Sequence, residues 1–128
     1  MNEHEEKTVE SFILREKRHR YKFLLDNSKK RAVELDRLNH CIDLDPKWIT
    51  WLPSNAAVVD LLRKEGSPKQ VYLISASEDL DGLTMFLEDA VESCPMKGWG
   101  TIVSCIPGKL AYYYDELGER RALLKKEV

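Results

Sequence analysis

The sequence predicts an α+β fold, in which N-terminal helices and one crossover helix pack on a small, mainly antiparallel sheet. Three runs of β-branched and aromatic residues support this prediction, at residues 71–75, 100–106 and 110–114, because such side chains suit a pleated, half-buried surface. Pro107 and Gly108 separate the last two runs and are typical of a turn. The N-terminal third instead has apolar residues at helical spacing. We therefore expect helices to cover one face of the sheet.

Two helices are expected before the sheet begins. Residues 8–25 contain neither glycine nor proline, and their apolar positions recur at helical intervals. Residues 26–28 are polar and compete for helical backbone bonds, so a break is expected there. A second helix then spans residues 29–40, with an apolar stripe toward the core that ends at Ile42. Residues 1–7 are expected to form a frayed tail.

The middle of the chain is divided by prolines. Pro46 ends the second helix, because proline lacks the backbone N–H that a helix interior needs. Residues 48–53 are short and aromatic, which fits either an edge strand or an apolar loop clamped over the core. Ser54 or Asn55 then caps a third helix, which stops at the Gly-Ser-Pro sequence of residues 66–68.

The remaining elements complete the predicted sheet. They are strands at residues 70–75, 101–106 and 109–115, an acidic turn at residues 77–82, a helix at residues 83–94, and a final segment at residues 120–125. The last two strands and the final segment follow one another with short connections, which is typical of an antiparallel meander.

Composition places the protein among ordered globular domains. At 128 residues the chain is near the commonest domain size, so one domain is expected over residues 1–128. No apolar run approaches the roughly 20 residues that cross a bilayer, and the acidic start is unlike a signal peptide. We therefore expect a cytoplasmic protein with no membrane contact. Cys41, Cys94 and Cys105 are widely spaced, which indicates free and buried thiols.

Few residues suggest a reaction. His40 and Cys41 are adjacent, but neighbours in sequence usually point in different directions, and a helix-end histidine explains His40 without a reaction. Ser104 and Cys105 alternate across a strand, which places Ser104 on the wetter face, and no glycine stands where an esterase elbow needs one. No catalytic residue, cofactor or metal site is predicted, and the sequence favours a protein that is not an enzyme. An enzyme using Cys41 or Cys105 ranks third among the hypotheses.

Positive charge is concentrated in residues 15–37, which hold nine Lys or Arg against four Asp or Glu. Aromatic residues lie between these charges, as in proteins that bind phosphates and stack bases. Nucleic-acid binding through Arg18, Arg20, Lys29 and Lys30 is therefore one hypothesis. A solvated helix face is the alternative explanation for the same charges.

Several segments, in order, resemble a group of small uncharacterised bacterial proteins. They include residues 35–40, 72–75 and 100–113, and residues 104–110 are the most distinctive of them. The resemblance covers about residues 28–125. It implies a bacterial, intracellular, single-domain protein, and it implies no activity, ligand or catalytic residue.

The first hypothesis is a non-catalytic protein-interaction or regulatory module. Trp48, Trp51 and Trp99 lie in segments expected to be loops or edges, where aromatic residues often anchor partners. Ordinary core packing is the alternative explanation for each tryptophan. A protein partner is therefore expected, and a homodimer stays open because the meander has an edge that a second copy can pair with.

Overall fold

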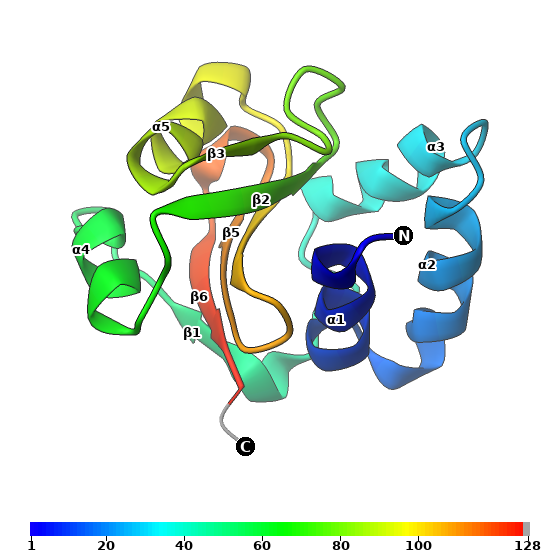
Figure 1. Ribbon diagram of the computed structural model, residues 1–128, viewed down its shortest axis with the longest axis horizontal. Helices are drawn as coiled ribbons and strands as arrows, with labels where there is room; N and C mark the ends of the chain where they lie inside the picture. The colour runs from blue at the N-terminus through cyan, green and yellow to red at the C-terminus, as the bar shows by residue number, and fades with distance from the viewer. Residues whose placement is uncertain (127–128) are drawn as a thin grey trace.

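The computed structural model describes residues 1–126 and consists of helices around an antiparallel sheet (Figure 1). The fold is α+β, as the sequence predicts. The helices are α1 (Glu3–Phe12), α2 (Arg18–Leu25), α3 (Arg31–Leu35), α4 (Val58–Lys64) and α5 (Leu87–Lys97). The strands are β1 (Ile49–Trp51), β2 (Gln70–Ser75), β3 (Thr84–Phe86), β4 (Thr101–Ile106), β5 (Leu110–Tyr114) and β6 (Arg121–Lys125). Short 3₁₀ turns are η1 (Arg15–Lys17), η2 (Asp36–Asn39), η3 (Pro46–Trp48) and η4 (Glu116–Gly118).

The strand order within the described residues is β1-β6-β5-β4-β2-β3, and every neighbouring pair is antiparallel. β4, β5 and β6 form the predicted meander, in which Val103 is opposite Tyr112 and Tyr112 is opposite Leu123. β2 pairs with the other side of β4, through Leu73 and Val103. The edges of the sheet are β1 and β3, each three residues long.

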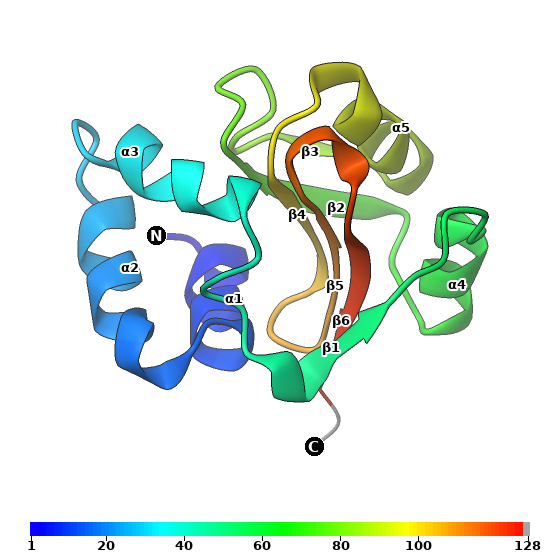
Figure 2. The same ribbon diagram turned by 180° about the vertical axis from the view of Figure 1, so that it is seen from behind.

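Helices cover both faces of the sheet, which corrects the expectation that they cover one. α1, α2 and α3 pack on one face, against Ile74, Ile102 and Tyr113. α4 and α5 pack on the opposite face, against Leu73 and Val103. Figures 1 and 2 show these two groups of helices on either side of the strands. The burial pattern agrees, because successive residues of β4 and β5 are buried, as in strands covered on both faces.

α1 includes most of the segment that we expected to be frayed, residues 1–7. The side chain of Asn2 caps the helix by accepting a hydrogen bond from the backbone N–H of Glu5 at 2.9 Å. Phe12 buries the other end of the helix against the sheet. The expectation was wrong because the partner that holds Glu5 is Arg31, 26 positions later, and no local pattern reveals it.

The single helix expected at residues 8–25 is two helices that separate at Ile13. Ile13 is extended, with φ −88° and ψ 142°, and forms a β-bridge with Leu44. The backbone N–H of Leu14 donates to the carbonyl of Asp43 at 2.8 Å. Apolar spacing alone continues through this point, so pairing with a distant segment causes the break.

Other differences concern shorter segments. Of the two alternatives for residues 48–53, the edge strand is confirmed as β1. The segment 83–94, expected to be a helix throughout, starts with strand β3, and α5 follows it. α5 continues through Pro95 and ends at Lys97. Pairing of β3 with β2 turns Phe86 outward, where it is 54% exposed. Ile42, expected at the end of the core stripe, is 56% exposed because it follows the end of η2.

Candidate partner-binding surface

Edge strand β1 is held in place by bonds before and after it. The side chain of Asp45 accepts a hydrogen bond from the backbone N–H of Lys47 at 3.0 Å and so starts η3. After the strand, the N–H of Leu52 donates to the carbonyl of Arg121 at 2.8 Å. Because hydrogen-bonded positions alternate along an antiparallel pair, the backbone groups of Trp51 point away from β6. The N–H and carbonyl of Trp51 therefore lie on the outer edge of β1, where no other strand of the described sheet pairs with them.

Tryptophans flank β1, each beside cationic groups. Trp51 is 48% exposed, and the guanidinium carbon of Arg120 lies 5.7 Å from its ring centre. Trp48 is partly buried against the core beneath α1, α2 and α3. The amino groups of Lys47 and Lys126 lie 4.9 Å and 5.2 Å from its ring centre. Each such contact stabilises a cation beside the ring by about 0.5–1 kcal/mol at exposed sites. The contact does not neutralise the charge of the cation.

A groove runs from β1 to the β5–β6 hairpin, and we call it the β1 groove. It consists of two adjoining hollows of about 360 Å³ and 310 Å³, which share Leu52, Glu119 and Arg121. The first hollow is also lined by Trp51 and Arg120. The second is also lined by Ser54, Pro95, Tyr114, Leu117 and Gly118. Apolar and cationic side chains therefore face the same open space.

The side chains that line the β1 groove carry one net positive charge. Arg120 and Arg121 line the groove. Lys47 and Lys126 lie over the nearby ring of Trp48. Glu119 is the acidic side chain among the residues that line the two hollows. Arg121 also donates to backbone carbonyls that follow β1, at 2.6 Å and 3.0 Å, and these neutral acceptors do not cancel its charge.

The tip of the β5–β6 hairpin presents an exposed leucine in an unfavourable conformation. Leu117 has φ 65° and ψ 5° and is 73% exposed. The left-handed region costs a non-glycine residue about 1–2 kcal/mol. Gly118 is also left-handed, and a β-carbon there would lie 2.7 Å from the ring of Tyr114, so this position requires glycine. The hairpin therefore places an apolar side chain beside the β1 groove at a cost to stability.

The third tryptophan lies outside β1, near the tip of the β5–β6 hairpin. Trp99 is 45% exposed, in the loop between α5 and β4. β5 and β6 separate β4 from β1 in the sheet. The structure therefore places Trp48 and Trp51 at β1, whereas Trp99 lies two strands away, next to Gly98, whose carbonyl accepts a hydrogen bond from the N–H of Leu117 at the hairpin tip.

The basic segment at residues 15–37 is partly neutralised inside the fold. Its ion pairs include Arg20–Glu34, Lys22–Glu10, Arg31–Glu5, Arg31–Asp81 and Arg37–Asp43. Among the predicted phosphate contacts, Arg20 is thus paired with a buried carboxylate, and Arg18 donates to a backbone carbonyl at 2.9 Å. Lys29 and Lys30 are exposed between α2 and α3.

A polar cluster that no sequence motif indicates lies beneath α1. Arg31 donates to Glu5, with Nη1 and Oε1 2.8 Å apart, and to Asp81, with Nε and Oδ2 2.7 Å apart. The hydroxyl of Tyr72 also donates to Glu5. Burial alone would raise the pKa of Glu5, but the hydrogen bonds from Arg31 and Tyr72 outweigh it and hold this pKa below its ordinary value. Burial and the bond to Glu5 raise the pKa of Tyr72 to about 12.

His4 and Ser104 extend this cluster without forming a catalytic pair. A hydrogen bond of 2.7 Å joins His4 Nδ1 to Ser104 Oγ, and the imidazole stacks on Tyr72. Burial lowers the pKa of His4. Ser104, expected on the wetter face, is 0% exposed, because α1 packs on β4 there. A serine that no substrate reaches cannot act as a nucleophile, so this contact is structural.

The His40 and Cys41 cluster does not assemble into a reactive site. His40 is exposed, whereas Asp43 is buried in an internal ion pair. Burial raises the pKa of Cys41 to about 11, that of Cys94 to about 12 and that of Cys105 to about 11. The reactive form of cysteine is the thiolate, which these environments disfavour. Among residues 1–126, no cluster of three or more His, Cys, Asp or Glu side chains is arranged to hold a metal.

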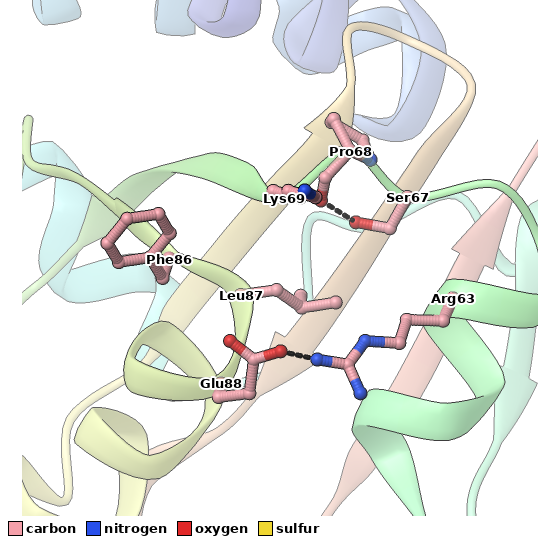
Figure 3. A pocket seen from close by; sticks show the side chains of 7 residues that line it. All are labelled: Arg63, Ser67, Pro68, Lys69, Phe86, Leu87 and Glu88. Atoms are coloured by element: carbon pink, nitrogen blue, oxygen red, sulfur yellow. Dashed lines mark hydrogen bonds and ion pairs between the residues drawn. The ribbon is translucent and has the colours of Figure 1, made fainter.

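A separate pocket of about 280 Å³ lies between α4 and the start of α5 (Figure 3). Beside Lys69, its polar side chains are engaged within the fold: Arg63 pairs with Glu88, and the hydroxyl of Ser67 donates to the carbonyl of Pro68 at 2.9 Å. Leu87 lies between these two pairs (Figure 3). The pocket therefore does not present a convergent set of groups for a ligand.

Comparison of the chain with protein-family models, with curated proteins and with solved structures finds no match. None of the helices formed by the described residues combines the length and the apolarity needed to cross a bilayer. The candidate surface around β1 therefore rests on its own geometry.

Proposed function

We propose that this protein is a non-catalytic protein-interaction or regulatory module that binds a partner through the β1 groove. The observation that carries the proposal is Trp51, an aromatic side chain 48% exposed on an edge strand and held beside Arg120. Tryptophan and arginine are enriched among the residues that dominate binding energy at protein interfaces. A rigid aromatic ring also provides a large contact area at a small entropic cost.

The surroundings of Trp51 give a partner more than one side chain to bury. Leu52 and Leu117 line the β1 groove, and Leu117 is 73% exposed at the hairpin tip. A stable complex buries about 800 Å² on each partner. The groove is therefore the proposed centre of an interface that extends onto the hairpin.

The groups that could perform chemistry support a non-catalytic function. Glu5 and Asp43 are engaged in internal ion pairs. The pKa values of Cys41 and Cys105 are raised by burial, so their thiolates are scarce at neutral pH. Ser104 is fully covered.

Nucleic-acid binding through residues 15–37 is the alternative function. Arg20 is paired with the carboxylate of Glu34, whereas Arg18 donates to a neutral carbonyl and keeps its charge, and Lys29 and Lys30 are exposed. Fewer cations are thus available to phosphates than the sequence suggests, and affinity for nucleic acid depends on their number. We therefore rank this function below protein binding.

We also propose that the protein resides in the bacterial cytoplasm. The cysteines Cys41, Cys94 and Cys105 are free thiols, which a reducing compartment favours.

The proposal is tested by capturing partners from cells of the source organism with the tagged protein and with Trp51→Ala and Phe23→Ala. Phe23 is 65% exposed on α2 and provides the matched aromatic control. Each captured protein is identified, purified and titrated against the three forms. Trp51→Ala is expected to weaken binding by about 30-fold, the loss typical of a central anchor, whereas Phe23→Ala leaves affinity unchanged. Thermal unfolding shows whether both variants are folded.

Equal affinity of the wild type and Trp51→Ala for every captured protein would contradict the proposal. Nuclease treatment separates the alternative function, because capture through nucleic acid disappears with it. Lys29→Gln with Lys30→Gln then weakens any such binding, and raising the salt concentration weakens it further. Trp99→Ala, tested in the same assay, shows whether Trp99 belongs to the interface.

A further inference from the structure

We infer that the outer edge of β1 binds an acidic segment of a partner protein in extended conformation, as an added strand of the sheet. The inference rests on the proposed function and deepens it, because it names the chemistry of the partner at the same site.

The backbone of β1 offers hydrogen-bonding groups at its outer edge. Leu52 bonds to Arg121 of β6, so alternation turns the N–H and carbonyl of Trp51 outward, together with the carbonyl of Ile49. The N–H of Ile49 is bonded to the carbonyl of Pro46, which closes the edge at that end. Figure 2 shows β1 crossing in front of the sheet, with no helix in front of it. An extended peptide carries the complementary alternation of donors and acceptors.

The side chains around this edge favour acidic residues in that peptide. Lys47 and Lys126 lie beside the start of β1, and Arg120 lies over Trp51 near its end. In an extended peptide, residues two apart point the same way and are about 6.7 Å apart. Alternating acidic residues therefore present a row of carboxylates to the cations on one face of the strand. Charge complementarity of this kind raises association rates and rejects wrong partners.

A second copy of the chain fits this edge less well. Pairing two β1 strands about a two-fold axis brings Lys47, Arg120 and Lys126 of each copy toward the same groups of the other. Like charges across an interface are unfavourable, and short, lysine-flanked edge strands are how proteins avoid pairing with themselves. The charges that attract an acidic strand thus oppose self-association.

Single-stranded nucleic acid also matches a basic, aromatic surface, but the geometry favours a peptide. Bases stack on open ring faces. Here Arg120 lies over Trp51, and Lys47 and Lys126 lie over Trp48. A peptide strand uses both the cations and the outward backbone groups of Trp51, whereas stacked bases leave the backbone edge unused.

The test uses fluorescein-labelled nonapeptides with alternating valine and glutamate residues and blocked ends, titrated with the whole protein by fluorescence anisotropy. One matched peptide has lysine in place of glutamate. Another keeps the glutamates and has a central proline, which removes an N–H from the ladder. The acidic peptide is expected to bind at least about tenfold more tightly than either. Arg120→Gln is expected to weaken its binding about threefold to fivefold, as for an exposed ion pair, and Lys29→Gln serves as the control.

Amide hydrogen exchange provides a readout that charge attraction alone does not change. If the peptide adds as a strand, exchange of the Trp51 N–H slows by at least about tenfold on binding, because this group then donates to the peptide. The effect is expected with the acidic peptide and not with the proline peptide. Exchange in α2, around Phe23, stays the same.

Equal binding of the glutamate and lysine peptides, or unchanged exchange at Trp51, overturns the inference. Tighter binding of an oligothymidylate of similar length also overturns it, as does a dimer in which the Trp51 N–H is protected without peptide. If the peptides fail while Trp51→Ala still weakens binding of the captured partner, the proposed function stands and the inference is wrong. If Trp51→Ala leaves that partner's binding unchanged as well, both are wrong.

Discussion

Arg31 and Asp81 are fifty positions apart in the chain and form a two-point ion pair, with Nε 2.7 Å from Oδ2 and Nη2 3.1 Å from Oδ1. The same guanidinium donates to Glu5 at 2.8 Å and 3.0 Å. Arg31 therefore ties α3 to α1 and to the turn that follows β2. The planar guanidinium suits this task, because its donors form a rigid fork that binds two carboxylates in fixed directions.

Arg31→Met is expected to lower the free energy of unfolding by about 3 kcal/mol, because it leaves two largely buried carboxylates without their cation. The side chains of Glu5 and Asp81 are 5% and 16% exposed, so water compensates little. Urea denaturation measures the change. Arg15→Met, at an exposed site, is the matched control and is expected to change stability by less than about 0.5 kcal/mol. Adding Glu5→Gln and Asp81→Asn to Arg31→Met restores part of the loss, and a fully stable single variant would contradict this account.

Acid is expected to destabilise the protein through Glu5 and Asp43. Burial opposes ionisation of both, but hydrogen bonds from Arg31 and Arg37 outweigh it, so both pKa values lie below the ordinary 4.5 and 3.8. A group with a lowered pKa stabilises the fold above its unfolded pKa, and this contribution is lost as pH falls through the folded pKa. The free energy of unfolding should therefore fall below pH 4.5. The double variant Glu5→Gln with Asp43→Asn should show a smaller decline in the free energy of unfolding, measured by urea titrations at a series of pH values. An equally steep decline in this variant would contradict the explanation.

Leu117→Asn is expected to raise the free energy of unfolding by about 0.5–1 kcal/mol, because asparagine tolerates the left-handed region better than leucine does. Little burial is lost, since Leu117 is 73% exposed. Leu83 is 42% exposed and does not have positive φ, so Leu83→Asn is the matched control and should not stabilise. Thermal and urea unfolding of both variants measure the difference. If the β1 groove is the interface, Leu117→Asn weakens partner binding while it stabilises the fold, and destabilisation by Leu117→Asn would refute the strain argument.

The cysteines are expected to react slowly with a thiol-specific disulfide reagent in the native protein. Burial raises the pKa of Cys41 and that of Cys105 to about 11, and that of Cys94 to about 12. Cys41 is half-buried and should react first, while Cys94 and Cys105 should react only after unfolding. Cys41→Ser should therefore leave the native protein almost unlabelled. If the native protein were labelled as fast as the unfolded chain, this would support a reactive cysteine.

The strands were predictable because their composition is local information. Residues 70–75 and 101–106 are strands in the structure at those bounds, since β-branched runs between turn residues suit a pleated sheet. The split of the N-terminal helix at Ile13 and the presence of β3 were not predictable from local patterns. Both depend on pairing with distant segments, Leu44 in one case and β2 in the other.

The candidate site was predictable only in part. The place of Trp51 in a short segment bounded by prolines indicates a surface position. Its neighbour Arg120 is distant in the sequence, so no local pattern reveals their contact. The sequence pattern assigns Arg31 to a basic segment, Asp81 to an acidic turn and Glu5 to the N-terminal tail, because each charge looks solvated in sequence. Burial of an ion pair depends on what packs above it, and charge counts contain no such information.

The pairing of Trp51 with Ala122 has a consequence for biosynthesis. A ribosome adds about 5–20 residues per second, so β1 emerges several seconds before β6 exists to receive it. During that interval α1, α2 and α3 also lack Ile102 and Tyr113, the sheet residues that cover them. The nascent chain thus exposes both edges of β1 and the apolar side of its first helices together.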